Sequence, residues 1–364
     1  MDNELLETSG LPSYCYTDEA ILERELEVHF EQSWISVAVA QMVPARGDVQ
    51  PLSVAGQSLL LTRDRGGAIH VFHNVCRHRG TQLVAKACHR GNGLVTCPYH
   101  SWTYGLDGEL AAAPYKNGTP GGSLNTSEKS KLALLPVRME IWCDIVFVNL
   151  SGNAAPFDEF IQPLAERWSV FDFKLLRLAT SQEFRLQANW KIAAENFLDS
   201  YHLPYIHPQM GEPGAPSYAL EHNVMSRDII GYIMPQFGVD QEDLLPGPMF
   251  PDMPQGFATT LDLVYVFPNT LLLLTSSWIQ LITLQPDEPG VTSQRLFGYL
   301  VGDDAVAEAG EALGAELGAV NRQDLDVLAR MQSGRRGEAS NQGQLATGWD
   351  ELAIILFKRA AEAY

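Results

Sequence analysis

Two short segments of the chain each place a cysteine and a histidine within three residues of each other. The first pairs Cys76 with His78, and the second pairs Cys97 with His100. Side chains alternate along an extended segment, so residues 76 and 78 point to the same side. In the second segment, Pro98 favours a tight turn that brings the thiol and the imidazole together. Two such loops facing each other would present two sulfurs and two nitrogens to one centre, and the fold around them must keep the loops together.

The order of these four residues distinguishes between two metal centres. Zinc accepts two cysteines and two histidines in a tetrahedron, but zinc fingers place both cysteines before both histidines. Here each loop carries one of each, which is typical of a [2Fe–2S] cluster in which two histidines replace two cysteines on one iron, the Rieske arrangement. Neutral imidazoles raise the reduction potential, so such a cluster acts as a mild one-electron relay. A structural zinc site is the alternative.

A second group of candidate ligands lies in the segment NWKIAAENFLDSYHLPYIHP. Helical propensity over residues 189–203 predicts that Asp199 and His202 share one helical face. Pro204 is expected to end this helix, so that His207 comes from the following turn and approaches His202. Two histidines and one carboxylate with open coordination positions form the facial triad that holds non-haem Fe(II). The alternative is that both histidines are ordinary residues at a polar helix end.

The segment NRQDLDVLARMQSG supplies the candidate carboxylate. Asp324 shares a helical face with Leu328 and Met331, so its side chain is predicted to point inward. Asp326 instead faces Arg330 at a spacing of four residues, which is typical of a solvated surface pair. Asp324 is therefore the predicted third ligand, and an ordinary helix carboxylate is the alternative.

Composition and charge exclude several classes of protein. The formal net charge of −19 argues against nucleic-acid binding, which needs a basic surface. Five cysteines are an odd number in a long chain, which favours a reducing, cytoplasmic compartment over a disulfide framework. The first twenty residues show neither the basic nor the apolar region of a secretory signal. Polar residues and Pro268 interrupt the apolar stretch 264–284, which predicts two buried strands and no membrane span.

The pattern of residue types along the chain predicts three parts. Residues 1–33 form an N-terminal segment, with an amphipathic helix over 18–33 capped by Thr17. Short β-branched runs separated by turn residues predict an all-β domain over residues 34–150. Residues 151–364 mix helices with strands, which predicts an α+β domain with an antiparallel sheet. The helices are expected at 157–170, 189–203, 303–331 and 348–363, and the strands at 180–187, 228–234, 262–284 and 291–301.

The segments that carry these motifs resemble the Rieske non-haem iron oxygenase family. CRHRG and CPYHSWTYGLDGEL resemble its cluster-binding loops, NWKIAAENFLDSYHLPYIH its iron-binding segment, and DLDVLARMQSG the C-terminal helix that supplies the carboxylate. The resemblance implies an α+β fold: an all-β Rieske domain plus a catalytic domain with a large antiparallel sheet flanked by helices, on which the N-terminal segment packs. It also implies a homotrimer, in which Asp199 hydrogen-bonds His202 and, across a subunit boundary, His100 of the neighbouring chain.

The same resemblance implies an activity. The chain would be a terminal oxygenase that uses O2 as a co-substrate and hydroxylates or oxidatively N-demethylates a small molecule. Electrons would come from NAD(P)H through a separate flavin and iron–sulfur reductase, since the chain has no G-x-G-x-x-G after a strand and no Walker A motif. A Rieske electron carrier without catalysis is the alternative of another class.

The substrate class follows from the region after Leu296. This region most resembles the single-subunit oxygenases that act on quaternary ammonium compounds such as carnitine, choline and betaines, although those enzymes usually have Glu where Gln323 and Ala329 stand here. Hydroxylation of an aromatic ring is the alternative. A quaternary ammonium is expected to contact aromatic faces. Six aromatic residues are candidates for this contact: Tyr201, Tyr205, Tyr218, Phe257, Tyr265 and Trp278.

Overall fold

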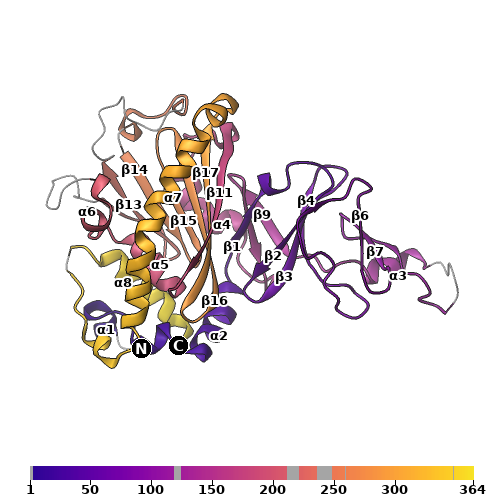
Figure 1. Cartoon of the computed structure of the whole chain (residues 1–364), viewed down its shortest axis with the longest axis horizontal. Helices are drawn as coiled ribbons and strands as arrows, with labels where there is room; N and C mark the ends of the chain where they lie inside the picture. Colours follow the sequence, from indigo (N-terminus) through magenta and orange to yellow (C-terminus); the bar gives the residue numbers. More distant parts are fainter. Residues whose placement is uncertain (1–2, 119–123, 211–220, 236–247, 259, 347) are drawn as a thin grey trace. The chain divides into compact units, whose positions relative to one another are not determined.

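The chain divides into two compact units in the computed structural model (Figure 1). One unit contains residues 36–154, and the other contains residues 1–35 together with residues 155–364. The structure describes residues 3–118, 124–210, 221–235, 248–258, 260–346 and 348–364. Within these ranges, no helix is both long and apolar enough to cross a bilayer.

The unit formed by residues 36–154 is built from short strands and the helix α3 (Thr126–Lys131). The strands form three sheets, in the orders β1-β10-β9, β4-β3-β2-β5 and β6-β7-β8. They are β1 (Ile35–Val39), β2 (Asp48–Val54), β3 (Gln57–Arg63), β4 (Ile69–His73), β5 (Cys88–His89), β6 (Leu94–Thr96), β7 (Thr103–Gly105), β8 (Leu110–Ala112), β9 (Arg138–Trp142) and β10 (Ile145–Asn149).

One core of this unit holds the two loops that carry the Cys–His pairs. Phe72 on β4 and Tyr104 on β7 are buried there beside Trp102. The side chains of Cys76 and Cys97 belong to the same buried cluster. Burial of such large apolar groups is the main favourable term in folding, so the loops are fixed at the sulfur end.

The other unit is organised around one seven-stranded sheet, in the order β11-β17-β16-β15-β14-β13-β12. Its strands are β11 (Leu176–Leu186), β12 (Glu221–Val224), β13 (Ile229–Pro235), β14 (Thr260–Val266), β15 (Thr270–Leu274), β16 (Trp278–Glu288) and β17 (Val291–Val301). Its helices are α1 (Asn3–Thr8), α2 (Glu19–Glu25), α4 (Phe157–Arg167), α5 (Trp190–Leu198), α6 (Leu203–Ile206), α7 (Asp303–Gly334) and α8 (Glu351–Ala360). Neighbouring strands of the sheet pair antiparallel, which confirms the predicted α+β fold. The apolar stretch 264–284 contributes to three strands, β14 to β16, where two were predicted.

Helix α7 lies directly on this sheet, against β11 and β17 (Figure 1). Glycines on both elements permit this close approach. A Cβ atom at Gly298 on β17 would lie 2.7 Å from Cγ2 of Thr180, and one at Gly314 on α7 would lie 2.8 Å from Oγ1 of the same threonine. The side chain of Gln182 on β11 also donates to the backbone carbonyl of Gly314 at 2.6 Å. These contacts fix the helix that carries Asp324.

Within the sheet-bearing unit, a buried carboxylate joins the N-terminal segment to helix α5. Glu25 on α2 accepts hydrogen bonds from Nζ of Lys191 at 2.6 Å and from Nε1 of Trp190 at 2.8 Å, both on α5. It also accepts a hydrogen bond from the hydroxyl of Tyr364, the last residue. One side chain therefore connects three segments that are far apart in the sequence.

The N-terminal helix differs from the predicted one. Helix α2 ends at Glu25, and a π-helical turn continues to Phe30. The cap is Asp18, whose side chain accepts the N–H of Ala20 at 2.8 Å. The prediction of Thr17 was wrong, because its hydroxyl donates to the carbonyl of the preceding turn instead.

Candidate functional site

The segment that carries both candidate histidines is broken into two helices. Helix α5 ends at Leu198 because Asp199 adopts an extended conformation, with φ −90° and ψ 123°. Helix α6 begins after His202 and has Pro204 in its first turn, where a missing N–H costs no hydrogen bond. Two predictions were therefore wrong: Asp199 and His202 do not share a helical face, and Pro204 opens a helix instead of ending one.

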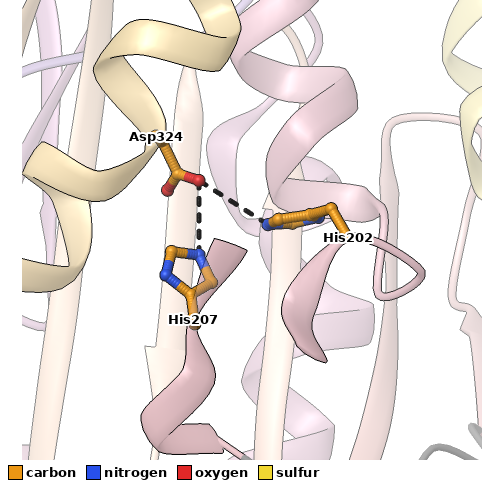
Figure 2. A group of neighbouring side chains, drawn as sticks. All are labelled: His202, His207 and Asp324. Atoms are coloured by element: carbon orange, nitrogen blue, oxygen red, sulfur yellow. Dashed lines mark ion pairs between the residues drawn. The ribbon is translucent and has the colours of Figure 1, made fainter. Parts of the chain in front are cut away.

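Three side chains from separate segments nevertheless converge, as Figure 2 shows. Oδ1 of Asp324 lies 3.2 Å from Nε2 of His207 and 3.7 Å from Nε2 of His202. The candidate ligand atoms all lie within 4.8 Å of one another. His207 is 2% exposed, and the other two side chains are 15% or less exposed, so the group is largely shielded from water.

Each histidine is oriented by an acceptor behind it. Nδ1 of His202 lies 3.1 Å from Oδ2 of Asp199, and Nδ1 of His207 lies 2.7 Å from Oε1 of Gln323. Both partners can accept a hydrogen bond, so a ring that carries its proton on Nδ1 would offer the lone pair of Nε2 to a metal ion. Sequence reasoning did not select Gln323 as a site residue. The signal available was its position directly before Asp324, where the resembling enzymes carry Glu.

This donor set fits a divalent metal ion. Oδ1 of Asp324 is buried, and no hydrogen bond of good geometry satisfies it. Burial alone would lower the pKa of His207, but the adjacent carboxylate of Asp324 outweighs burial and raises that pKa. The carboxylate thus favours a positive charge on the facing imidazole, and a metal ion would supply that charge instead. Two imidazoles and one carboxylate on one side of an ion are the ligands of non-haem Fe(II).

The two Cys–His loops have the same backbone hydrogen bond. The N–H of each cysteine donates to the carbonyl five residues further on, from Cys76 to Thr81 at 2.8 Å and from Cys97 to Trp102 at 2.7 Å. Each loop therefore turns back on itself and presents its cysteine and histidine from one short turn. The pair of loops is alike in geometry although the Cys–His spacings differ by one residue.

The sulfurs lie inside the unit and the imidazoles lie at its surface. Cys76 and Cys97 are 3% and 2% exposed, whereas His78 and His100 are exposed. The two imidazole centroids are 4.8 Å apart, and the ring of His78 stacks on Trp102 at 5.0 Å with an interplanar angle of 8°. The structure thus brings the two loops together, with thiols on one side and imidazoles on the other.

The surroundings of the thiols favour thiolate ligands. Burial alone would raise the pKa of Cys97, but hydrogen bonds from the backbone N–H groups of Tyr99 and His100 outweigh burial and lower that pKa. The hydroxyl of Tyr104 lies 3.4 Å from Sγ of Cys76 and accepts the N–H of Arg77 at 3.1 Å, so its proton is free for the sulfur. These residues fit a [2Fe–2S] cluster held by two thiolates and two imidazoles.

A cavity of about 120 Å³ opens beside His202, His207 and Asp324. One face of the sheet forms its apolar wall, because every second residue of four neighbouring strands points into it. These wall residues are Tyr232 and Met234 on β13, Leu261 and Leu263 on β14, Leu271 and Leu273 on β15, and Gln280, Ile282 and Leu284 on β16. Helices α5 and α7 close the other side, with Ala193, Asn196, Phe197, Val320, Asn321 and Leu328.

Five of the six aromatic candidates for contact with the substrate do not line this cavity. Tyr201 and Tyr205 are 47% and 62% exposed, and the hydroxyl of buried Tyr265 donates to the carbonyl of Pro268. Phe257 and Trp278 also lie outside the lining, and Tyr218 lies outside the described residues. Among the described residues, the phenylalanine and tyrosine side chains that line it are those of Phe197 and Tyr232.

Comparison with known proteins identifies the family of the chain. The family described as ring hydroxylating alpha subunit (catalytic domain) matches residues 173–364, and the Rieske [2Fe-2S] domain matches residues 33–127. The chain belongs to the ring-hydroxylating alpha subunit family. A Rieske domain and a catalytic domain of this family imply a Rieske cluster and a mononuclear iron in the ring-hydroxylating alpha subunit.

Several curated relatives of this alpha subunit are monooxygenases or demethylases. It is 32% identical to the glycine betaine monooxygenase oxygenase subunit of Pseudomonas aeruginosa, over 55% of this chain and 45% of that protein. It is 34% identical to the carnitine monooxygenase oxygenase subunit of Escherichia coli, over 54% of this chain and 52% of that protein. The N,N-dimethyl phenylurea N-demethylase subunit alpha of a Sphingobium species is 33% identical, over 57% of this chain and 46% of that protein. The chain thus spans about half the length of the curated relatives that it matches.

Solved structures share the fold of this alpha subunit over nearly its whole length. The quaternary ammonium Rieske monooxygenase CntA in complex with L-carnitine aligns with a TM-score of 0.77 and 23% identity, covering 97% of this chain and 94% of CntA. Naphthalene 1,2-dioxygenase from a Rhodococcus species, bound to indole, aligns with a TM-score of 0.79 and 21% identity, covering 97% of this chain and 93% of the dioxygenase chain.

Proposed function

We propose that this chain is the terminal oxygenase component of a Rieske non-haem iron oxygenase. The observation that carries the proposal is the convergence of His202, His207 and Asp324 beside an apolar cavity. An electron carrier would need the Cys–His loops but would have no use for a second metal site with a substrate-sized cavity. Membership in the ring-hydroxylating alpha subunit family supports the same conclusion.

The roles of the metal-binding residues follow from their chemistry. Cys76, Cys97, His78 and His100 would hold the [2Fe–2S] cluster in a domain of residues 34–150. His202, His207 and Asp324 would hold Fe(II) in a catalytic domain of residues 151–364, on which the segment 1–33 packs. Bound there, the cluster would relay single electrons and the mononuclear iron would activate O2.

Other side chains of the protein orient the metal ligands and shape the substrate cavity. Asp199 and Gln323 hold protons on the Nδ1 atoms of His202 and His207, which keeps both Nε2 lone pairs available. The leucine-rich wall desolvates the substrate and excludes water from the reacting bond. One O2, two electrons and two protons convert a C–H bond into C–OH and one water. A hydroxylated N-methyl group then loses formaldehyde and leaves the demethylated amine.

The chain would work with two kinds of partner. Electrons would come from NAD(P)H through a separate flavin and iron–sulfur reductase. The side chain of Asp199 is 26% exposed and the imidazole of His100 is exposed, which suits contact between copies of the chain in a homotrimer. We place this assembly in the cytoplasm.

The names of the relatives favour an N-methylated substrate. Glycine betaine and carnitine are quaternary ammonium compounds, and N,N-dimethyl phenylurea also carries N-methyl groups. The proposed reaction is therefore hydroxylation or oxidative N-demethylation of such a compound, with a quaternary ammonium compound as the leading substrate class. Ring hydroxylation of an aromatic compound is the second candidate, favoured by the apolar lining of the cavity.

Substrate-dependent oxygen uptake tests this function. The protein, purified with its metals and mixed with NADH and a surrogate reductase, is screened against quaternary ammonium compounds, N-methyl amides and ureas, and aromatic acids. The proposal predicts oxygen uptake with stoichiometric formaldehyde for an N-methyl compound. If the reductase reduces the cluster of the fully metallated protein but no oxygen is consumed with any of these compounds, the protein would instead be an electron carrier.

A further inference from the structure

The described residues that line the cavity beside the three candidate iron ligands include no lysine or arginine. The residues outside the described ranges cannot supply one either, because the sequence has no lysine or arginine at any of those positions. Strands β14, β15 and β16, which form most of the apolar wall, also contain neither residue.

Basic residues on the two helices that close the cavity are directed elsewhere. Nζ of Lys191 on α5 lies 2.6 Å from the carboxylate of Glu25. On α7, Nε of Arg330 lies 2.8 Å from the carboxylate of Asp326 at the surface, and Arg322 is exposed. A negatively charged group in the cavity would therefore find no lysine or arginine among the described residues around it.

The lack of lysine and arginine around the cavity limits which chemical group the substrate can carry at the end that does not react. A carboxylate such as that of glycine betaine would lose its hydration in the cavity and gain no cationic partner there. This loss of hydration is strongly unfavourable. The lining also contains the carboxylate of Asp199, whose charge would repel that of the substrate. The cavity thus disfavours the anionic group of a betaine but not its N-methyl groups.

One polar group of the lining is a hydrogen-bond donor without a partner. Asn321 lies one helical turn before Asp324 on α7, on the same face. Its Oδ1 accepts the side-chain N–H of Gln294 at 2.6 Å, which leaves Nδ2 as the free end of the amide. That Nδ2 is buried and has no hydrogen-bond partner. A buried donor of this kind favours a ligand that brings an acceptor.

We propose that the site takes an N-methyl compound whose other end is a neutral oxygen acceptor, and that Asn321 donates to this oxygen. The acceptor is a hydroxyl or carbonyl, and the substrate class excludes carboxylated betaines. This inference rests on the proposed oxygenase function and narrows its substrate. Asn321 is then a residue that determines specificity, one turn away from the metal ligand Asp324.

Choline and glycine betaine provide a matched comparison. Both carry a trimethylammonium group, and they differ in a terminal hydroxyl against a carboxylate. The holoenzyme with reductase should demethylate choline, or the neutral N,N-dimethyl phenylurea, with a kcat/KM about 100-fold or more above that for glycine betaine and carnitine. Calorimetric titration under anaerobic conditions should show the same order in Kd.

Substitution of the donor tests its role. Asn321→Leu keeps the size of the side chain and removes the N–H, so kcat/KM for the preferred substrate should fall about ten-fold, chiefly through KM. Trimethylamine, which carries no oxygen, should be affected less than three-fold if it is turned over. The exposed Asp326→Ala on the same helix is the control and should match the parent enzyme.

The possible failures can be distinguished. Equal or better turnover and binding of glycine betaine would overturn the inference while leaving the oxygenase function intact. An Asn321→Leu variant that treats all substrates as the parent enzyme does would remove Asn321 from recognition. Absence of the mononuclear iron together with absence of turnover would overturn the oxygenase function, and this inference with it.

Discussion

Asp324 and Asp326 lie two positions apart on α7 but occupy opposite environments. The side chain of Asp324 is 14% exposed and faces two histidines, whereas that of Asp326 is 75% exposed and pairs with Arg330 at 2.8 Å. Asp324→Ala should remove the mononuclear iron and lower turnover by roughly 100-fold or more, because two imidazoles alone hold the ion poorly. The Asp326→Ala variant should retain both the mononuclear iron and the turnover of the parent enzyme. Iron analysis and oxygen uptake measure this, and full activity of Asp324→Ala would place the third ligand elsewhere.

Tyr104 allows a test at the cluster without removal of a ligand. Its hydroxyl lies 3.4 Å from Sγ of Cys76, and a hydrogen bond to sulfur stabilises the more negative, reduced cluster. Tyr104→Phe should therefore lower the reduction potential by roughly 50 mV while the visible spectrum is retained. A redox titration followed by absorbance measures the shift. An unchanged potential would show that this hydroxyl does not donate to the cluster.

Single residues were predictable from the sequence where chemistry restricts the choice. The Cys–His spacing and the inward face of Asp324 led to side chains that the structure brings together, although their metal-binding roles stay predictions. Gln323 and Asn321 were missed because an amide has no motif of its own. Their contacts with His207 and Gln294 depend on which turn of α7 passes over the site, and a local pattern does not give that.

The contact between α2 and α5 depends on one buried ion pair. Glu25 and Lys191 are both 0% exposed, and burial lowers the pKa of Lys191 although Glu25 acts to raise it. Glu25→Leu would leave the lysine buried without a partner, so the free energy of unfolding should fall by about 3–5 kcal/mol. The double variant Glu25→Leu with Lys191→Met should recover most of this loss. Urea titration measures it, and a loss near zero for the single variant would contradict the account.

Glu195 on α5 should make stability depend on pH. Burial raises its pKa from 4.5 to about 7; the nearby Arg335 opposes this, whereas Asp350 and Asp199 add to it. The folded protein therefore holds a proton that the unfolded chain releases above pH 4.5. This contribution to stability is complete below pH 4.5 and is lost as the pH rises through 7.

Glu195→Gln removes this titration. Between pH 5 and 8 the parent protein should lose about 2 kcal/mol more stability than the variant does. Urea unfolding across this pH range measures the difference. Parallel stability curves for the two proteins would mean that Glu195 is ionised throughout.

Elements were predictable where the periodicity is long. The predicted helix at 303–331 corresponds to α7, and the predicted strand at 291–301 to β17. The helix at 189–203 was not, because the side chain of Asp199 accepts the N–H of Tyr201 and the chain turns there. The helical propensity of the segment concealed this turn signal. Tyr201 and Tyr205 do not line the cavity, since side-chain direction after α5 depends on the break between α5 and α6.

At the scale of the whole molecule, the proposed function requires one chain to hold two different metal centres. The Cys–His loops would hold the cluster, and His202, His207 and Asp324 would hold the third iron. The composition of the chain, with an odd number of cysteines and no nucleotide motif, is consistent with this division of labour. It predicts that electrons arrive from another protein and that the reaction takes place beside the leucine-rich cavity.

Iron and acid-labile sulfide content tests this claim most directly. Protein purified under anaerobic conditions should contain about three iron atoms and two sulfides per chain, and should show the visible absorption of a Rieske cluster. A colourless protein that contains zinc, or one free of both iron and sulfide, would contradict the account.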